Sequence, residues 1–121
     1  MDDIGRIVDF LIEHNKYEDR ELLKKYIEEH REYGTLDYAI DTNGAIVAVC
    51  RWNVSADGNV ADILDFAIRD SHRNKGIGGN FIVRAMRKFP KLESLEFTRG
   101  VRGDMRVKKL SIKGILKRNI F

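Results

Sequence analysis

The first third of the chain repeats apolar residues every three or four positions, which is the spacing of one face of an α-helix. Residues 3–14 carry such a stripe and predict an amphipathic helix. Residues 19–31 carry a second stripe, and we expect that helix to bury Leu22, Leu23, Tyr26 and Ile27. Gly34 follows, and a glycine there is typical of a helix end. The pattern predicts a helical pair over residues 1–33.

From residue 36 the period changes to two, as expected for strands with one buried face. Residues 36–40 and 45–54 alternate on either side of Asn43-Gly44, a dipeptide typical of a tight type I′ hairpin turn. A polar turn at residues 56–59 precedes a third strand over residues 60–69. We expect the three strands of residues 36–69 to pair antiparallel.

A helix and a fourth strand come next. The helix ends before Pro90, and its apolar stripe is expected to cover the sheet. Residues 92–98 fit a strand, which the crossover helix would place parallel to the third strand. Residues 105–117 fit either a short helix ending near Gly114 or a strand, because Leu110 and Ile112 alternate.

A basic loop rich in glycine lies between the third strand and this helix. Its glycines, which let a backbone approach a ligand closely, are Gly76, Gly78 and Gly79. The first amides of the helix lack intrahelical partners and can point at an anion. Arg73 and Lys75 add positive charge. The P-loop pattern fails after Gly76, and the dinucleotide fingerprint fails at Phe81. The loop therefore predicts a phosphate site of another kind.

This stretch resembles the acetyl-CoA-binding segment of the GCN5-related N-acetyltransferase (GNAT) superfamily. The family's Arg/Gln-x-x-Gly-x-Gly/Ala motif is matched by Arg73, Asn74, Lys75, Gly76, Ile77 and Gly78. Phe66 and Ile68 match the apolar alternation of the preceding strand, whereas Asp70 replaces a common proline and Gly79 a frequent Ser/Thr. The resemblance is good over residues 62–89, is plausible in topology back to residue 36, and is poor after Thr98.

The resemblance implies an α/β fold with a mixed central sheet, antiparallel hairpins plus one parallel pair, flanked by helices. It implies acetyl-CoA as co-substrate, with no metal, and transfer of the acetyl group to an amine that the sequence does not identify. Backbone groups of Phe66 and Ile68 would pair with the pantetheine arm. The amides from Arg73 to Gly79 would hold the pyrophosphate.

Asp62 is the candidate catalytic base. Counted back from the glycine loop, it falls where the histone-acetylating branch of the family has its glutamate. Strand alternation places Asp62 on one face with Leu64, Phe66 and Ile68, and Asp65 on the other face. The alternative is that Asp62 is a solvated residue at a strand end. The family's usual late tyrosine, the acid for the thiolate, is missing, because no tyrosine follows Tyr38.

The length of 121 residues fits a single domain, residues 1–121. Its parts are the helical pair (1–33), three antiparallel strands (36–69), the loop, helix and strand (73–98), and a basic C-terminal segment (99–121). Residues 1–33 hold ten acids against six bases, and residues 99–121 hold eight bases against Asp104 alone. Such a segment can attract nucleic acid, an acidic partner or coenzyme A phosphates. A second hypothesis is therefore a GNAT scaffold without turnover that binds acyl-CoA, nucleic acid or protein. A homodimer sharing sheet edges fits both.

The remaining candidate residues favour structural roles. Cys50, the single cysteine, fits a small core residue, and one cysteine favours a reducing, cytoplasmic location. His72 fits loop packing better than proton transfer, and Trp52 either lines a groove or packs in a strand. The three histidines show no metal-ligand spacing. Neither a signal peptide nor a membrane-spanning run is expected.

Overall fold

The computed structural model describes residues 3–101 and 104–113, together with the side chains of these residues except those of 98–110. The helices are α1 (Asp3–Asn15), α2 (Arg20–Tyr33), a short 3-10 turn η1 (Asp70–His72) and α3 (Ile77–Lys88). The strands are β1 (Leu36–Ile40), β2 (Ile46–Val54), β3 (Val60–Ile68), β4 (Ser94–Val101) and β5 (Asp104–Ser111).

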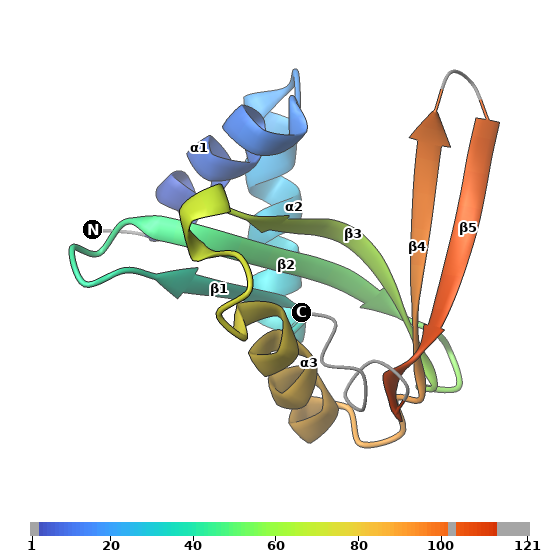
Figure 1. The fold of residues 1–121 in the computed structure, drawn as a ribbon. Coiled ribbons are helices and arrows are strands. Elements are labelled where there is room, and N and C mark those ends of the chain that lie inside the picture. Colours follow the sequence, from blue (N-terminus) through green and yellow to red (C-terminus); the bar gives the residue numbers. More distant parts are fainter. Residues whose placement is uncertain (1–2, 102–103, 114–121) are drawn as a thin grey trace.

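The five strands form one mixed sheet in the order β1-β2-β3-β4-β5. The β1–β2, β2–β3 and β4–β5 pairs are antiparallel, and β3 and β4 are parallel. α1 and α2 cover one face of the sheet and α3 covers the other (Figure 1). The predicted fold class is confirmed. Of the two alternatives for residues 105–117, the strand is correct over β5 and the helix is wrong there; residues 114–117 lie outside the described part.

Each face of the sheet has its own hydrophobic core. The core under α1 and α2 includes Ile7, Leu11 and Ile27, each fully buried. The core under α3 includes Trp52 and Phe81. Two helical predictions need correction, because Leu22 and Tyr26 are 44% and 42% exposed. They lie on the side of α2 that turns away from the core occupied by Leu23 and Ile27.

The turn between β1 and β2 also differs from the prediction. A type I′ turn needs positive φ at both central residues, but of Asn43 and Gly44 only Gly44 has it, at 81°. The turn instead spans Asp41–Gly44, with the Gly44 amide donating to the Asp41 carbonyl at 3.0 Å. The Asp41 carboxylate accepts bonds from the amides of Asn43 and Ala45, at 2.8 and 3.0 Å. Asp41 thus stabilises a longer turn.

Candidate active site

The two parallel strands are joined over only part of their length. β3 pairs with β4 from Val60–Ser94 to Ile63–Phe97, yet β3 continues to Ile68 and β4 to Val101. Beyond these pairs the strands diverge (Figure 1). The resemblance implied such a divergence of the parallel strands, and the region between residues 64–68 of β3 and 98–101 of β4 is called the opening.

A β-bulge lies where the divergence begins. On β2 and β3, Arg51 pairs with Asp65 and the next residue, Trp52, pairs with Ile63. Leu64 is therefore the extra residue, and the side-chain alternation of β3 changes phase there.

The bulge overturns one prediction about Asp62. Ile63, before the bulge, and Phe66 and Ile68, after it, all belong to the core under α3. Asp62 pairs across the ladder with Asn53 and, next to Ile63, must face the α1/α2 side of the sheet. The predicted common face of Asp62 with Phe66 and Ile68 is therefore wrong, because simple alternation ignores the extra residue.

The backbone of β3 beyond the bulge is oriented toward the opening. The Arg69 amide donates to the Val47 carbonyl of β2 at 2.8 Å. Because hydrogen-bonding groups alternate along a strand, those of Phe66 and Ile68 point away from β2, toward the side where β4 has diverged. The Phe66 ring meets the Phe81 and Phe97 rings edge-on, with centroids 6.3 and 6.2 Å apart.

The segment from β3 to α3 folds as a tight loop that ends in an uncapped helix. Asn74 and Gly76 adopt positive φ, at 62° and 83°. Gly76 is the N-cap of α3, with no side chain bonded to the helix start. Within the part of the chain that the structure describes, the amides of Lys75 to Gly79 have no loop or side-chain acceptor. The helix start can therefore accept an anion.

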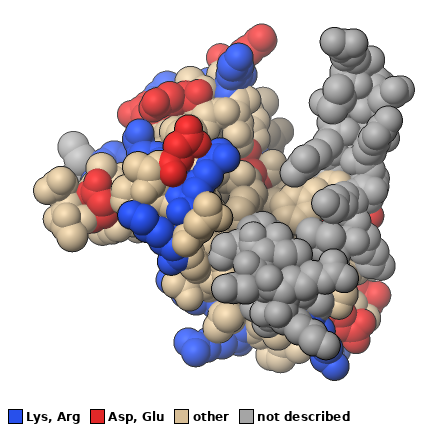
Figure 2. All heavy atoms as spheres, in the orientation of Figure 1, with Lys and Arg blue, Asp and Glu red and all other residues tan. Residues whose placement is uncertain are grey.

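Basic side chains accompany this loop. On the face shown in Figure 2, Lys and Arg atoms gather over the segment between β3 and α3. Arg73 is exposed, and its Nε lies 3.1 Å from an Asp70 carboxylate oxygen and 3.4 Å from the Ile68 carbonyl oxygen. Lys75 is exposed as well. An exposed ion pair contributes little, so Arg73 can exchange Asp70 for another anion.

A buried polar network lies beside the bulge on the α1/α2 face. Asp65 is 2% exposed and accepts bonds from Arg51 Nε at 2.6 Å and Asn15 Nδ2 at 2.8 Å. The Tyr17 hydroxyl donates to the same carboxylate at 2.5 Å and accepts from Arg51. Burial, followed by the bond to Asp65, raises the pKa of Tyr17. The network fastens the α1–α2 connection to the bulge.

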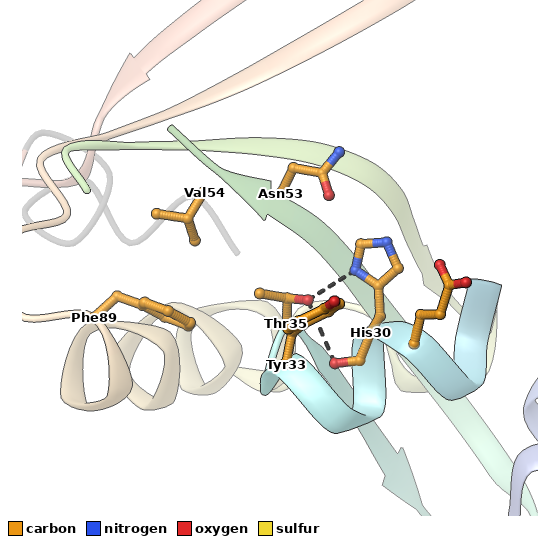
Figure 3. A pocket seen from close by; sticks show the side chains of 7 residues that line it. His30, Tyr33, Thr35, Asn53, Val54 and Phe89 are labelled. Carbon is orange, nitrogen blue, oxygen red and sulfur yellow. Dashed lines mark hydrogen bonds between the residues drawn. The ribbon is translucent and has the colours of Figure 1, made fainter. Parts of the chain in front are cut away.

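A pocket of about 440 Å³ lies at the end of this face where β2 continues past the start of β1 (Figure 3). His30 and Tyr33 of α2, Asn53 of β2 and Phe89 after α3 are among its walls. The His30 Nδ1 lies 2.8 Å from the Thr35 hydroxyl. Burial, and then the Arg51 charge, lower the pKa of His30. The sequence analysis missed both the pocket and the network; the available signals were two charged residues, Arg51 and Asp65, within apolar strands.

Three other residues singled out in the sequence have packing or local hydrogen-bonding contacts. Trp52 is 2% exposed in the core under α3, which is the packing alternative. Cys50 is buried in the same core, and burial raises the pKa of its thiol. His72 is half-buried, with Nδ1 2.9 Å from the Ser71 hydroxyl. Among the side chains that the structure describes, no group of three metal-ligating residues comes together.

The helices of the described ranges are all too short or too polar to cross a bilayer.

The sequence model of the acetyltransferase (GNAT) family matches residues 6–99, which include the bulge, the loop and both diverging strands. The chain belongs to this family. The family prediction is confirmed. The match begins well before residue 36, the first residue over which the topology alone suggested the family. No curated protein sequence matches the chain.

Solved GNAT structures share the fold at low sequence identity. A Pyrococcus horikoshii protein provisionally classed as an acetyltransferase is 19% identical over 98% of this chain and 40% of its own, with a TM-score of 0.60. An aminoglycoside 6′-N-acetyltransferase complexed with coenzyme A is 13% identical over 78% and 54%, with a TM-score of 0.59. The spermidine/spermine N-acetyltransferase SpeG of Vibrio cholerae is 13% identical over 97% and 92%, with a TM-score of 0.58. The chain thus spans about half the length or less of the first two.

Proposed function

We propose that the chain transfers an acetyl group from acetyl-CoA to a primary amine by direct attack. The observation that carries this proposal is the uncapped start of α3, with Gly76 at positive φ, next to the opening between β3 and β4. A diphosphate at the helix start would accept hydrogen bonds from the amides of residues 75–79. The positive charges of Arg73 and Lys75 would attract it.

The pantetheine arm would occupy the opening. The backbone groups of Ile68 and Phe66 face that side, where an extended amide chain can pair as a strand would. The thioester would then lie near Leu64, since β3 and β4 are paired from Ile63 back to Val60. The similar structure that holds coenzyme A favours this ligand.

The reaction forms an N–C bond and breaks the C–S bond of the thioester. The acceptor ammonium loses one proton before attack and the amine nitrogen a second as the amide forms, while the thiolate takes up one proton to leave as the thiol. Asp62 is the proposed base. It is half-buried, lies two residues before the bulge, and faces the α1/α2 side, from which an acceptor can approach. Two of the similar structures favour an amine acceptor, because one is named an aminoglycoside N-acetyltransferase and the other a spermidine/spermine N-acetyltransferase.

Calorimetric titration with acetyl-CoA tests the proposal. Wild type should bind, and Gly78→Glu should remove binding by placing a carboxylate at the helix start. Because Gly78 is buried, exposed Lys75 provides a second variant. Lys75→Glu should weaken binding roughly tenfold, the effect of reversing one nearby charge. Lys91→Glu, an equal charge change at an exposed site beyond α3, is the control.

The absence of heat from wild type would overturn the proposal. Binding without release of coenzyme A thiol, across a panel of amines, would favour the binding-module hypothesis instead. Of the basic side chains in residues 99–121 that motivate nucleic-acid binding, the structure describes only that of Lys113.

A further inference from the structure

The pocket at the end of α2 has the chemistry of a cation site. Among its described lining residues, Glu29 carries the one carboxylate, and burial and the Arg51 charge lower the pKa of His30. Figure 3 shows the His30 ring between Thr35 and Asn53, held by the bond from Nδ1 to the Thr35 hydroxyl. The pocket is therefore acidic on one wall and neutral on the others.

The remaining walls suit an alkyl ammonium group. Tyr33 and Phe89 contribute aromatic rings, Asn53 contributes an amide oxygen, and Val54 contributes apolar surface. Aromatic faces attract ammonium ions, and the carboxyl end of a helix such as α2 carries partial negative charge. The volume of about 440 Å³ is in the range of small-molecule sites.

The pocket is close to the proposed reaction centre. Asn53, which lines the pocket, pairs with Asp62 on the neighbouring strand and faces the same side of the sheet. Leu64 is two residues further along β3, roughly 7 Å at the rise of a strand. The Asn53 side of the pocket thus lies next to the strand that leads to the bulge.

We propose that this pocket holds the non-reacting ammonium of a diamine acceptor, whose second amine is presented at the bulge. An ammonium paired with Glu29 is stabilised in its charged form and cannot attack a thioester, so the nucleophile must be a different nitrogen. That nitrogen forms the new N–C bond as the C–S bond breaks, giving the mono-acetylated diamine, the thiol and one released proton. The acetyl-transfer part of this inference rests on the proposed function. The diamine-binding part rests on the pocket alone.

Binding of 1,4-diaminobutane and 1-aminobutane, measured by calorimetry, tests it. Wild type should bind the diamine several-fold more tightly than the monoamine. Glu29→Gln should weaken binding of both amines roughly fivefold, as expected for the loss of one exposed ion pair. Glu28→Gln makes the same charge change at the adjacent, exposed residue outside the pocket lining and should have no effect.

A second variant checks the aromatic wall. Tyr33 is 75% exposed, so Tyr33→Ala should fold normally and weaken diamine binding about threefold. Equal affinity of wild type for both amines, or a Glu29→Gln variant that behaves as wild type, would overturn the inference. If amines are acetylated but Glu29 has no influence, the inference fails and the proposed function stands. If diamine binding depends on Glu29 while acetyl-CoA does not bind, the proposed function fails and the pocket assignment stands.

Discussion

Arg51 Nε lies 2.6 Å from Asp65 Oδ2, directly across the irregular step at which Leu64 is left out of the β2–β3 ladder. Both side chains are almost fully buried, at 8% and 1% exposure. The carboxylate also accepts hydrogen bonds from the Asn15 amide and the Tyr17 hydroxyl, so three neighbouring side chains donate to it. A charged pair therefore fixes the place where the strand changes phase.

Removing one member of this pair should be costly. Asp65→Asn leaves the Arg51 guanidinium buried without its counter-charge, and we expect a loss of about 3–5 kcal/mol in the free energy of unfolding. Urea unfolding followed by circular dichroism measures it. The exposed pair of Arg20 and Asp9 is the control, and Asp9→Asn should cost less than about 1 kcal/mol. Equal losses in the two variants would contradict the assignment.

Two glycine substitutions should have opposite effects. Gly76 has φ of 83° and open space where a Cβ would lie, so Gly76→Ala should destabilise by about 1–2 kcal/mol through backbone strain alone. Gly5 lies within α1 and also has open space around it, so Gly5→Ala should stabilise by roughly 0.5–1 kcal/mol. Thermal unfolding compares them. A stabilising Gly76→Ala would mean that the loop conformation is not the one described.

Asp62 should matter for turnover rather than for folding. Replacing it with asparagine removes a proton acceptor near the bulge and should lower kcat about 100-fold at neutral pH. Thiol release from acetyl-CoA measures the rate, and acetyl-CoA affinity should not change. Asp57→Asn, in the exposed turn before β3, provides the control. An Asp62→Asn enzyme that retains the full rate would exclude the proposed base.

His30 should make folding stability depend on mildly acidic pH. Its pKa in the folded chain lies below the ordinary value of 6.5, so between these two values the unfolded chain binds more protons. The free energy of unfolding is therefore expected to fall as pH drops through about 6.5, and to recover above it. His30→Gln should show a smaller decrease between pH 7.5 and 5. Identical pH profiles, or an NMR titration of the His30 ring at 6.5 or above, would contradict this.

The Cys50 thiol should be unreactive in the folded protein. It is 4% exposed and its pKa is raised by burial, so little thiolate is available. Ellman's reagent should react with it only after denaturant is added, at a rate that follows global unfolding. Rapid labelling of native protein would show that the core under α3 opens readily.

Much of this fold could be predicted because periodicity and turn residues act locally. The apolar stripe of α1 and the alternation of β2 each need only a short window of sequence. The loop around Gly76 could be predicted because positive φ and an uncapped helix start require a specific residue type at that position. Which apolar residues at the margin of a helix stripe are buried was harder to predict, as the exposed positions of Leu22 and Tyr26 show.

The candidate site depends on relationships that no short window contains. The extra residue at Leu64 exists only as a mismatch between β2 and β3, and it alone decides which face Asp62 occupies. The pocket combines Glu29, Asn53 and Phe89 from three elements, so its charge emerges only when those elements pack. Tyr17 likewise meets Asp65 across 48 positions of sequence.

The short parallel seam of Val60–Ile63 with Ser94–Phe97 has a mechanical consequence. Few backbone rungs tie the β4–β5 hairpin to the rest of the sheet, so its amide hydrogens should exchange with deuterium before those of β2. A ligand bound between the diverging strands would add hydrogen bonds to both of them. Amide hydrogens of β4 and β5 should then exchange more slowly with the ligand bound, because the ligand would link the two parts of the sheet.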